Sequence, residues 1–254
     1  MEAWMRFLFK FLSLLSFCFV ISCGKSDTGA GKGQGPIEGS FTQNETIMVD
    51  GSNIKGIYSA DLFPINNNLQ LKKVGVAAVK RKGDIFTVKV KIKYGQIDTV
   101  LKQAIYTGRR CPDINDDLNK DAFIDIQEAL IAIGKITIPL DSNIESQQAG
   151  LDEYPIGDAV SGGYFYKMNT SFSKMFADLK NSDEDPYDNI VKLKKKGGLT
   201  FPGRVVLLQG LHESIFLPDT AATTENESKH TTIPIACGVL WKVNKFPKEI
   251  QEGR

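Results

Sequence analysis

The sequence predicts a mainly β protein, an all-β sandwich with one or two helical insertions. Apolar and polar side chains alternate over Ile85–Tyr94 after one irregular step, which is the period of a strand with one face in water. Val74–Val79 is a second apolar run, and Lys80–Asp84, which contains Gly83, supplies a turn between the two. The two segments therefore form a predicted β-hairpin. Helix signals, by contrast, are few.

Further segments carry strand or helix character. The remaining strand candidates are Lys135–Leu140, Gly163–Lys167, Arg204–Gln209 and Ile233–Val243. The helix candidates are the stretch after Asp125, with Ile126, Ala129, Leu130 and Ala132, and a short piece over Ser171–Leu179, where Ser171 or Ser173 could cap. No internal repeat of fixed period is visible. The favoured organisation is one β-sandwich domain over residues 41–254, with two smaller domains as the alternative.

Residues 1–22 have the pattern of a secretory signal peptide. Arg6 and Lys10 precede the apolar run Phe11–Ile21, which is shorter than the ~20 residues that a membrane span needs. The run ends in Val-Ile-Ser-Cys, and this tetrad resembles the lipobox of bacterial lipoproteins. The resemblance implies a palmitate-type lipid on Cys23 that holds the chain in a bilayer of the bacterial envelope, at the outer membrane or surface, facing the periplasm or the exterior. The alternative is a buried core helix that ends in cysteine.

Residues 23–40 are expected to form a flexible tether behind the lipid. Gly24–Ser40 is rich in glycine and nearly free of apolar side chains, so it cannot bury enough surface to offset the entropy of ordering it.

The charge balance argues against nucleic acid as a partner. Removing residues 1–22 leaves 29 basic and 29 acidic residues, so the formal net charge is zero. Such a chain has no net basic field to attract phosphate or an anionic bilayer. Attachment to the lipid bilayer is therefore expected through the acyl group on Cys23 alone.

Cysteine usage predicts one disulfide. Cys18 leaves with the signal peptide and Cys23 carries the lipid, so Cys111 and Cys237 remain. Two thiols in an oxidising compartment should pair. The bridge would tie the middle of the chain to its end, which suits one domain better than two.

Asp117–Glu128 has the spacing of a twelve-residue calcium loop. Oxygen-bearing side chains stand at positions one, three, five, nine and twelve, and position seven offers its backbone carbonyl. Ile124 at position eight is apolar, as in the EF-hand and dockerin-like loops that this segment resembles, where that residue pins the loop to its neighbour. The other interpretation is a solvated acidic turn. The expected calcium ligands are Asp117, Asn119, Asp121, Phe123, Asp125 and Glu128.

Ala122 departs from the loop pattern. Position six requires a positive φ and normally holds glycine, so alanine there carries a penalty of about 1 kcal/mol. The loop also has no second EF-hand to pair with. The expected calcium affinity is therefore in the weak extracellular range, with a dissociation constant of about 10⁻⁴ to 10⁻³ M.

Three short segments resemble copper/zinc superoxide dismutases. Ile235–Leu240, with its Ala-Cys-Gly-Val core, is similar to the closing strand that carries the second disulfide cysteine of that family. Arg204–Gly210 is similar to the strand that ends in a copper-binding histidine before glycine, and Tyr106–Cys111 to the approach to the first cysteine. The resemblance implies a Greek-key sandwich with a Cys111–Cys237 bridge, of the kind found in bacterial lipoproteins that build a calcium loop into a dismutase-like sandwich.

The same resemblance exposes a missing copper site. Ala104, Tyr106 and Gln209 stand where the family has imidazoles, and nitrogen ligands are what select copper. His212 and His230 are the chain's only histidines, and both lie far apart in segments typical of surface loops. Dismutase activity is not expected.

Two classes of function remain. The favoured one is a non-enzymatic calcium-binding envelope lipoprotein that binds an unknown envelope or extracellular macromolecule or contributes to the envelope itself. The sequence has no Gly-x-Ser-x-Gly elbow, no His-Glu-x-x-His and no glycine-rich phosphate loop. The alternative is a hydrolase or other enzyme with an unrecognised carboxylate site.

Overall fold

The computed structural model describes residues 54–66, 72–93, 99–147, 153–157, 163–180, 199–224 and 227–251. All of them belong to one compact unit, Thr46–Arg254. The predicted signal peptide, the predicted lipid site Cys23 and the predicted tether over 23–40 lie outside the described residues. No helix in the described ranges is both long enough and apolar enough to cross a bilayer.

Strands dominate the described part of the chain. They are β1 (Gly56–Pro64), β2 (Gly75–Lys82), β3 (Ile85–Ile92), β4 (Lys102–Tyr106), β5 (Ile136–Pro139), β6 (Tyr164–Ser171), β7 (Val205–Gln209), β8 (Pro234–Val239) and β9 (Trp241–Val243). The helices are the 3-10 turn η2 (Ile114–Asp116), α1 (Ile126–Ile133), α2 (Phe172–Lys180), α3 (Lys229–Thr232) and α4 (Lys248–Gln251). The predicted fold class, mainly β with a helical insertion, is confirmed.

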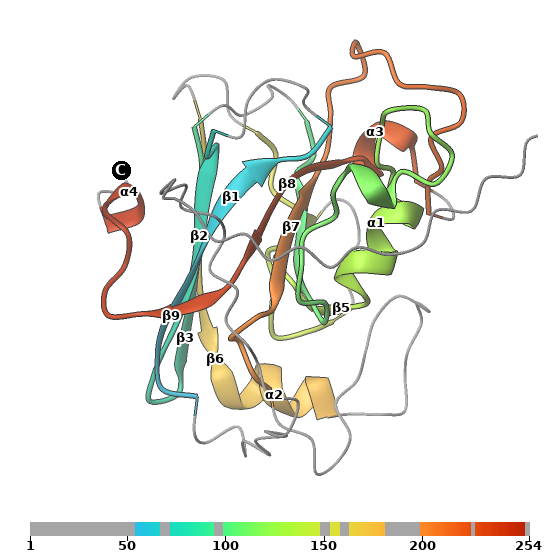
Figure 1. Ribbon diagram of the computed structural model, residues 1–254. Helices are drawn as coiled ribbons and strands as arrows, with labels where there is room; N and C mark the ends of the chain where they lie inside the picture. The colour runs from blue at the N-terminus through green and yellow to red at the C-terminus, as the bar shows by residue number, and fades with distance from the viewer. Residues whose placement is uncertain are drawn as a thin grey trace, which may run out of the picture. The chain divides into compact units, whose positions relative to one another are not determined.

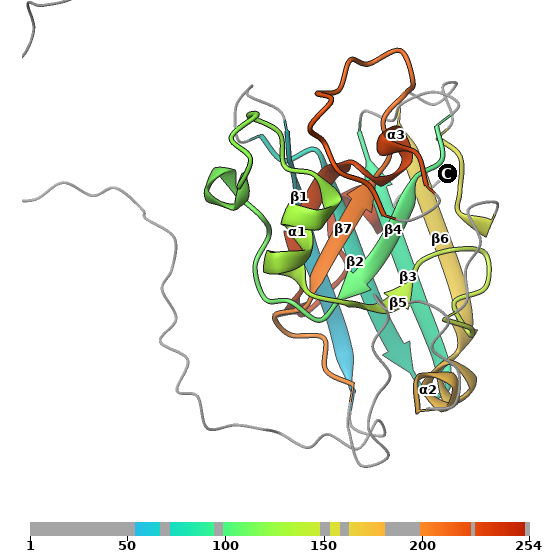
Figure 2. The same cartoon turned by 90° about the vertical axis from the view of Figure 1, so that its right-hand side faces the viewer.

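The strands form one antiparallel sheet that curls into two layers (Figures 1 and 2). Its order is β5-β4-β7-β8-β1-β2-β3-β6, and β9 pairs with β1. Gly56–Leu62 of β1 pair with β2, and its last two residues, Phe63 and Pro64, pair with β8, so β1 links the layers. β8 lies beside β1, next to the meander β1-β2-β3, although β4–β7 come between β3 and β8 in the chain. The main core lies between the layers and includes Phe86, Leu101 and Phe201.

The predicted hairpin is present as β2 and β3. Val79 pairs with Val88 across it, and Gly83 occupies the turn with a positive φ of 61°. Burial alternates strictly along β3 from Phe86 to Ile92, as the sequence pattern predicts. The predicted helices after Asp125 and over Ser171–Leu179 are also found, and the hydroxyl of Ser171 accepts a hydrogen bond from the Lys174 N–H in the first turn of α2.

Three features of the sheet differ from the expectation. β1 and β4 are additional strands, and β4 lacks alternation because four of its five residues are buried. β6 continues past Lys167 to Ser171. The predicted strand Ile233–Val243 divides at Leu240 into two strands. β8 pairs with β7, and β9 pairs with Ile57–Ser59 near the start of β1. The chain therefore changes layer at this point.

The outer face of the layer β8-β7-β4-β5 carries a second apolar cluster, which positions the acidic loop. Ile126, Ala129 and Ile133 of α1 pack there against residues of the sheet that include Tyr106 and Leu207. In Figure 2, α1 lies on the viewer's side of the sheet, next to β7. The acidic loop precedes this helix and is therefore attached to the outside of the sandwich.

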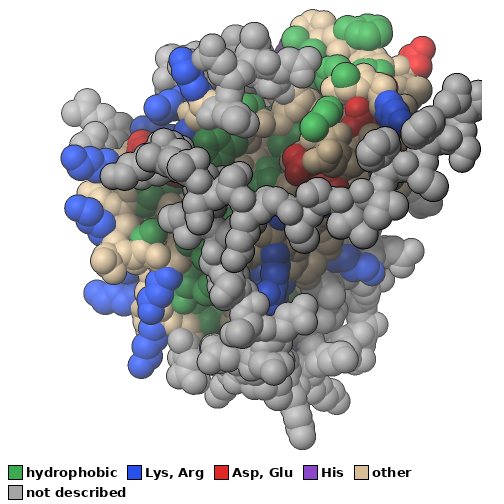
Figure 3. Space-filling view, in the orientation of Figure 1, with side chains coloured by type: hydrophobic (Ala, Val, Ile, Leu, Met, Phe, Trp, Pro, Cys, Tyr) green, Lys and Arg blue, Asp and Glu red, His purple; other side chains and the backbone are tan. Residues whose placement is uncertain are grey.

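Charged side chains are unevenly distributed although the predicted mature chain is neutral. Lysines project from the outer face of the other layer, where Lys89 lies opposite Lys167 in the pairing of β3 with β6. Figure 3 shows Lys and Arg side chains along the β2–β3 side of the molecule and Asp and Glu side chains beside α1. The acidic side chains thus gather around the loop.

Candidate functional site: the acidic loop before α1

The segment between β4 and β5 crosses the outer face of the sheet and carries the acidic loop. Its start is held close to the end of α1, because the Gly108 N–H donates to the Ile133 carbonyl over 2.5 Å. A Cβ at Gly108 would lie 2.4 Å from the Ile133 carbonyl, so only glycine fits this approach.

One disulfide and one ion pair fix the chain just before the loop. A disulfide joins Cys111 to Cys237 of β8, with their Cα atoms 5.8 Å apart, in agreement with the predicted pairing. Arg110 donates to both carboxylate oxygens of Asp116 over 2.6 Å. The Arg110 guanidinium holds the pKa of Asp116 below its usual range, so this carboxylate is a stable anchor one residue before the loop.

The first half of the loop is folded around its own carboxylates. Asp117 accepts hydrogen bonds from the N–H groups of Asp121 (3.2 Å) and Ala122 (2.9 Å). The Asn119 side-chain oxygen also accepts from Asp121 N–H (2.9 Å), and Asp121 accepts from Phe123 N–H (2.8 Å). These bonds fold the first half of the loop into a turn held by its own side chains.

The second half of the loop is the N-terminus of α1. Asp125 is the N-cap and accepts from the Glu128 N–H over 3.0 Å, while Glu128 accepts from the Asp125 N–H over 3.1 Å, a reciprocal capping box. Glu128 also accepts from the N–H groups of Leu118 and Asn119. Both carboxylates are buried, at 2% and 5% exposure. Glu128 thus joins the start of the loop to its end.

The backbone at position six has the expected strained geometry. Ala122 has φ = 67°, and Lys120, two residues earlier, has φ = 59°. Ala122 is exposed, so no packing contact of its side chain requires this conformation. A positive φ at position six is what the calcium-loop spacing predicts, whereas the positive φ of Lys120 was not predicted.

The donor atoms suit calcium in kind. Carboxylates, an amide oxygen and a backbone carbonyl are the hard oxygen ligands that calcium takes. Within the described ranges, however, no group of three or more His, Cys, Asp or Glu side chains is gathered closely enough to hold a metal ion. The carboxylates instead accept hydrogen bonds from loop N–H groups, so cation binding requires them to close inward.

A segment distant in sequence also holds the loop. The Thr220 hydroxyl donates to Asp121, and the Ala222 N–H donates to Asp125 over 2.8 Å. The Gln127 side-chain amide donates to the Thr223 carbonyl over 3.0 Å. Burial alone would raise the pKa of Asp121, but the hydrogen bonds from Thr220 and Phe123 outweigh it and lower that pKa. The sequence spacing gave no signal for these contacts.

The dismutase-like positions lie on the same outer face. Ala104, Tyr106 and Gln209 are buried at 1–2% exposure beneath the segments that cover the sheet. Next to them in the register, Lys102 pairs with Gln209 across β4 and β7, and its ammonium donates to both carboxylate oxygens of Glu227 over 2.6 and 2.8 Å. A half-buried ion pair and an amide therefore occupy this surface.

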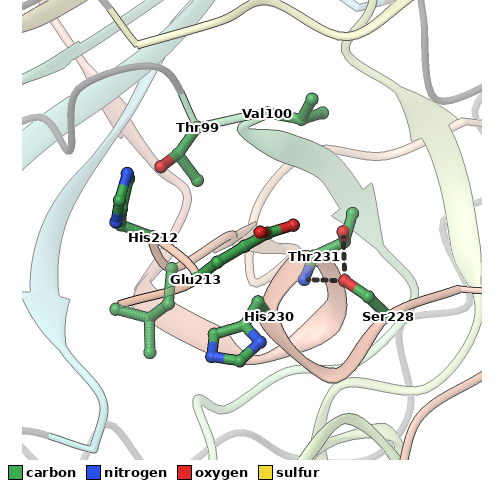
Figure 4. Close-up of a pocket in the computed structure, with 8 residues that line it drawn as sticks. Thr99, Val100, His212, Glu213, Ser228, His230 and Thr231 are labelled. Carbon is green, nitrogen blue, oxygen red and sulfur yellow. Dashed lines mark hydrogen bonds between the residues drawn. The ribbon is translucent and has the colours of Figure 1, made fainter. Parts of the chain in front are cut away.

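The two histidines lie closer together than the sequence indicates, and this expectation was wrong. The Leu211 N–H donates to the His230 carbonyl over 2.7 Å, and His230 belongs to α3 and not to a loop. Both histidines line a cavity of about 360 Å³ with Glu213. Figure 4 shows their imidazole rings and the Glu213 carboxylate pointing in three different directions. The cavity brings these groups near one another without forming a ligand cluster.

A second cavity, of about 550 Å³, opens beside the disulfide. Its walls are mainly apolar, and both Cys111 and Cys237 contribute to them. Phe63 and Trp241, which also line it, remain 41% and 47% exposed. An aromatic, concave surface is thus open to solvent near the start of the acidic loop.

No family model and no curated protein matches this chain. Solved structures similar to it include a copper/zinc superoxide dismutase from Brucella abortus, at 13% identity and a TM-score of 0.37, covering 72% of this chain and 98% of that one. A superoxide-dismutase-like protein from Bacillus subtilis gives 14% identity and a TM-score of 0.33, with 72% and 97% covered. A double mutant of that protein gives 16% and 0.35, with 71% and 95% covered. Scores this low carry no argument about function.

Proposed function

We propose that this chain is a non-enzymatic, calcium-binding lipoprotein of the bacterial envelope, in which calcium orders a loop on the outside of a β-sandwich. The observation that carries the proposal is the loop Asp117–Glu128, where twelve-residue spacing, the positive φ of Ala122 and the capping box at α1 coincide. Calcium would relieve the repulsion among four carboxylates, namely Asp117, Asp121, Asp125 and Glu128.

Direct titration of the full chain with calcium tests the site. We expect one ion per chain, with a dissociation constant in the weak extracellular range of about 10⁻⁴ to 10⁻³ M. Glu128→Gln should abolish measurable binding because it removes the bidentate ligand. Glu213→Gln, the same change at an exposed glutamate outside the loop, is the matched control and should bind as the wild type does. Equal binding by both variants, or none by the wild type, would contradict the proposal.

The lipid anchor is a separate part of the proposal. It rests on the lipobox-like tetrad before Cys23 and implies the bilayer as a partner. Labelling of cells with a palmitate analogue should mark the wild-type chain and leave Cys23→Ser unmarked and released from the membrane fraction. Equal labelling of both chains would contradict the assignment.

The observations favour the non-enzymatic class over a carboxylate-based hydrolase. Such an enzyme needs two carboxylates facing a cleft that substrate can enter. Burial raises the pKa of Asp141 to about 6, the kind of shift that marks a catalytic acid, but this side chain is completely buried and out of reach of a substrate.

A further inference from the structure

Asn66 connects the end of β1 to the acidic loop. It lies two residues after Pro64, the last residue of β1, in the left-handed region with φ = 58°. This conformation turns its side chain toward Ile124, a residue 58 positions later in the chain. Asparagine tolerates a positive φ better than most residues do. The side-chain amide of Asn66 thus contacts the middle of the loop from a backbone position with a positive φ.

The amide of Asn66 is almost fully used. Its side-chain oxygen accepts from the Ile124 N–H over 2.5 Å, and its nitrogen donates to the Ile124 carbonyl over 2.7 Å. The same nitrogen donates to the carbonyl of Pro234, the first residue of β8, over 3.1 Å. Only one orientation of the amide satisfies all three partners, with oxygen toward the N–H and nitrogen between the two carbonyls.

The two bonds to Ile124 have the pattern of a strand pair. In an antiparallel ladder, one residue exchanges both its N–H and its C=O with a single partner. Here the side-chain amide of Asn66 takes the place of that partner's peptide groups. Ile124 stands at position eight of the loop, the position at which EF-hand and dockerin-like loops are pinned to a neighbour.

We propose that Asn66 is the positioning residue of the calcium loop and replaces the second loop that this chain lacks. The inference rests on the calcium-binding function proposed above. Ile124 lies between Phe123, whose carbonyl is the expected ligand at position seven, and Asp125 at position nine. Holding both peptide groups of Ile124 fixes the direction of the ligand on either side. Binding then costs less ordering of the loop.

Two Asn66 variants separate this role from general support of the fold. Asn66→Asp has nearly the same shape but places a carboxylate oxygen against two carbonyl oxygens. Asn66→Gly keeps the positive φ and removes the amide. Asn169→Asp is the control, because this exposed residue on β6 acts as an acceptor for Thr87 and keeps that function as aspartate.

Calcium titration of the full-length chains provides the test, with melting temperatures measured in a calcium chelator alongside. We expect the dissociation constant to rise at least tenfold in both Asn66 variants and to stay within twofold of the wild type in Asn169→Asp. Asn66→Gly carries the test alone if Asn66→Asp does not fold. A lower melting temperature with an unchanged dissociation constant would overturn the inference and leave the calcium site intact. A wild-type chain that binds no calcium would overturn the proposed function itself.

Discussion

The outer face of the layer β8-β7-β4-β5 holds two regions that the sequence compares with known metal sites. The two regions differ in their donor atoms. The acidic loop has an oxygen donor at every position that calcium requires and a backbone that already adopts the strained turn at Ala122. The dismutase-like positions instead hold an alanine, a buried tyrosine and an amide beside the Lys102–Glu227 ion pair. The two regions therefore lead to different expectations: the donor atoms of the acidic loop suit calcium, and those of the dismutase-like positions do not suit copper.

The largest expected effect is the absence of superoxide dismutase activity at the dismutase-like positions. The full chain, loaded with copper and zinc, should show no superoxide dismutase activity above that of the free metals, because Ala104, Tyr106 and Gln209 cannot ligate copper as imidazoles do. A true dismutase works near the diffusional limit of about 10⁸ to 10⁹ M⁻¹s⁻¹, so the difference spans many orders of magnitude. Stopped-flow decay of superoxide measures it. Turnover near that limit would show that the dismutase-like region binds a redox metal, and would contradict the prediction.

The disulfide joins the segment before the acidic loop to β8 of the sheet. Cys111→Ser combined with Cys237→Ser opens a cross-link between residues 126 apart in sequence. The free energy of unfolding should fall by roughly 4 to 5 kcal/mol in the chain-entropy model, measured by urea denaturation with calcium held constant. A double variant as stable as the wild type would show that the bridge does not constrain the unfolded chain.

Asp141 shows how burial acts on a carboxylate that, among the described residues, has no ion-pair partner. Burial raises its folded pKa to about 6, above its ordinary value of 3.8, although the Asn143 N–H donates to it. The folded state therefore holds the proton more tightly, and this contribution to stability is present below about pH 4 and is lost as the pH rises through about 6.

Asp141→Asn should remove this dependence. The stability of the variant relative to the wild type is expected to increase by about 2 to 3 kcal/mol between pH 4 and pH 7.5, since one pKa unit corresponds to about 1.4 kcal/mol. Urea denaturation at the two pH values measures the difference. A relative stability that does not change with pH would show that Asp141 is charged and paired in the folded protein.

The sequence predicts well what depends on local spacing and poorly what depends on distant pairing. The hairpin, α1 and the loop geometry at Ala122 follow from residues that are neighbours in the chain. The contacts of Asn66 and of Thr220 with the loop depend on how β1 ends and on where residues 218–224 return. β4 gives no strand signal because burial on both faces removes alternation. The two histidines line one cavity because they follow β7 and precede β8, and these strands are paired.

The measurement that tests the account most directly is the melting temperature of the full-length wild type, Ala122→Gly and Glu128→Gln, each in calcium and in chelator. At ten times its dissociation constant, calcium should stabilise the wild type by roughly 1.4 kcal/mol and raise its melting temperature by a few degrees. The gain should grow in Ala122→Gly, which relieves the positive φ, and largely vanish in Glu128→Gln. Melting temperatures that do not respond to calcium in any of the three chains would contradict the account and leave the loop as a solvated acidic turn.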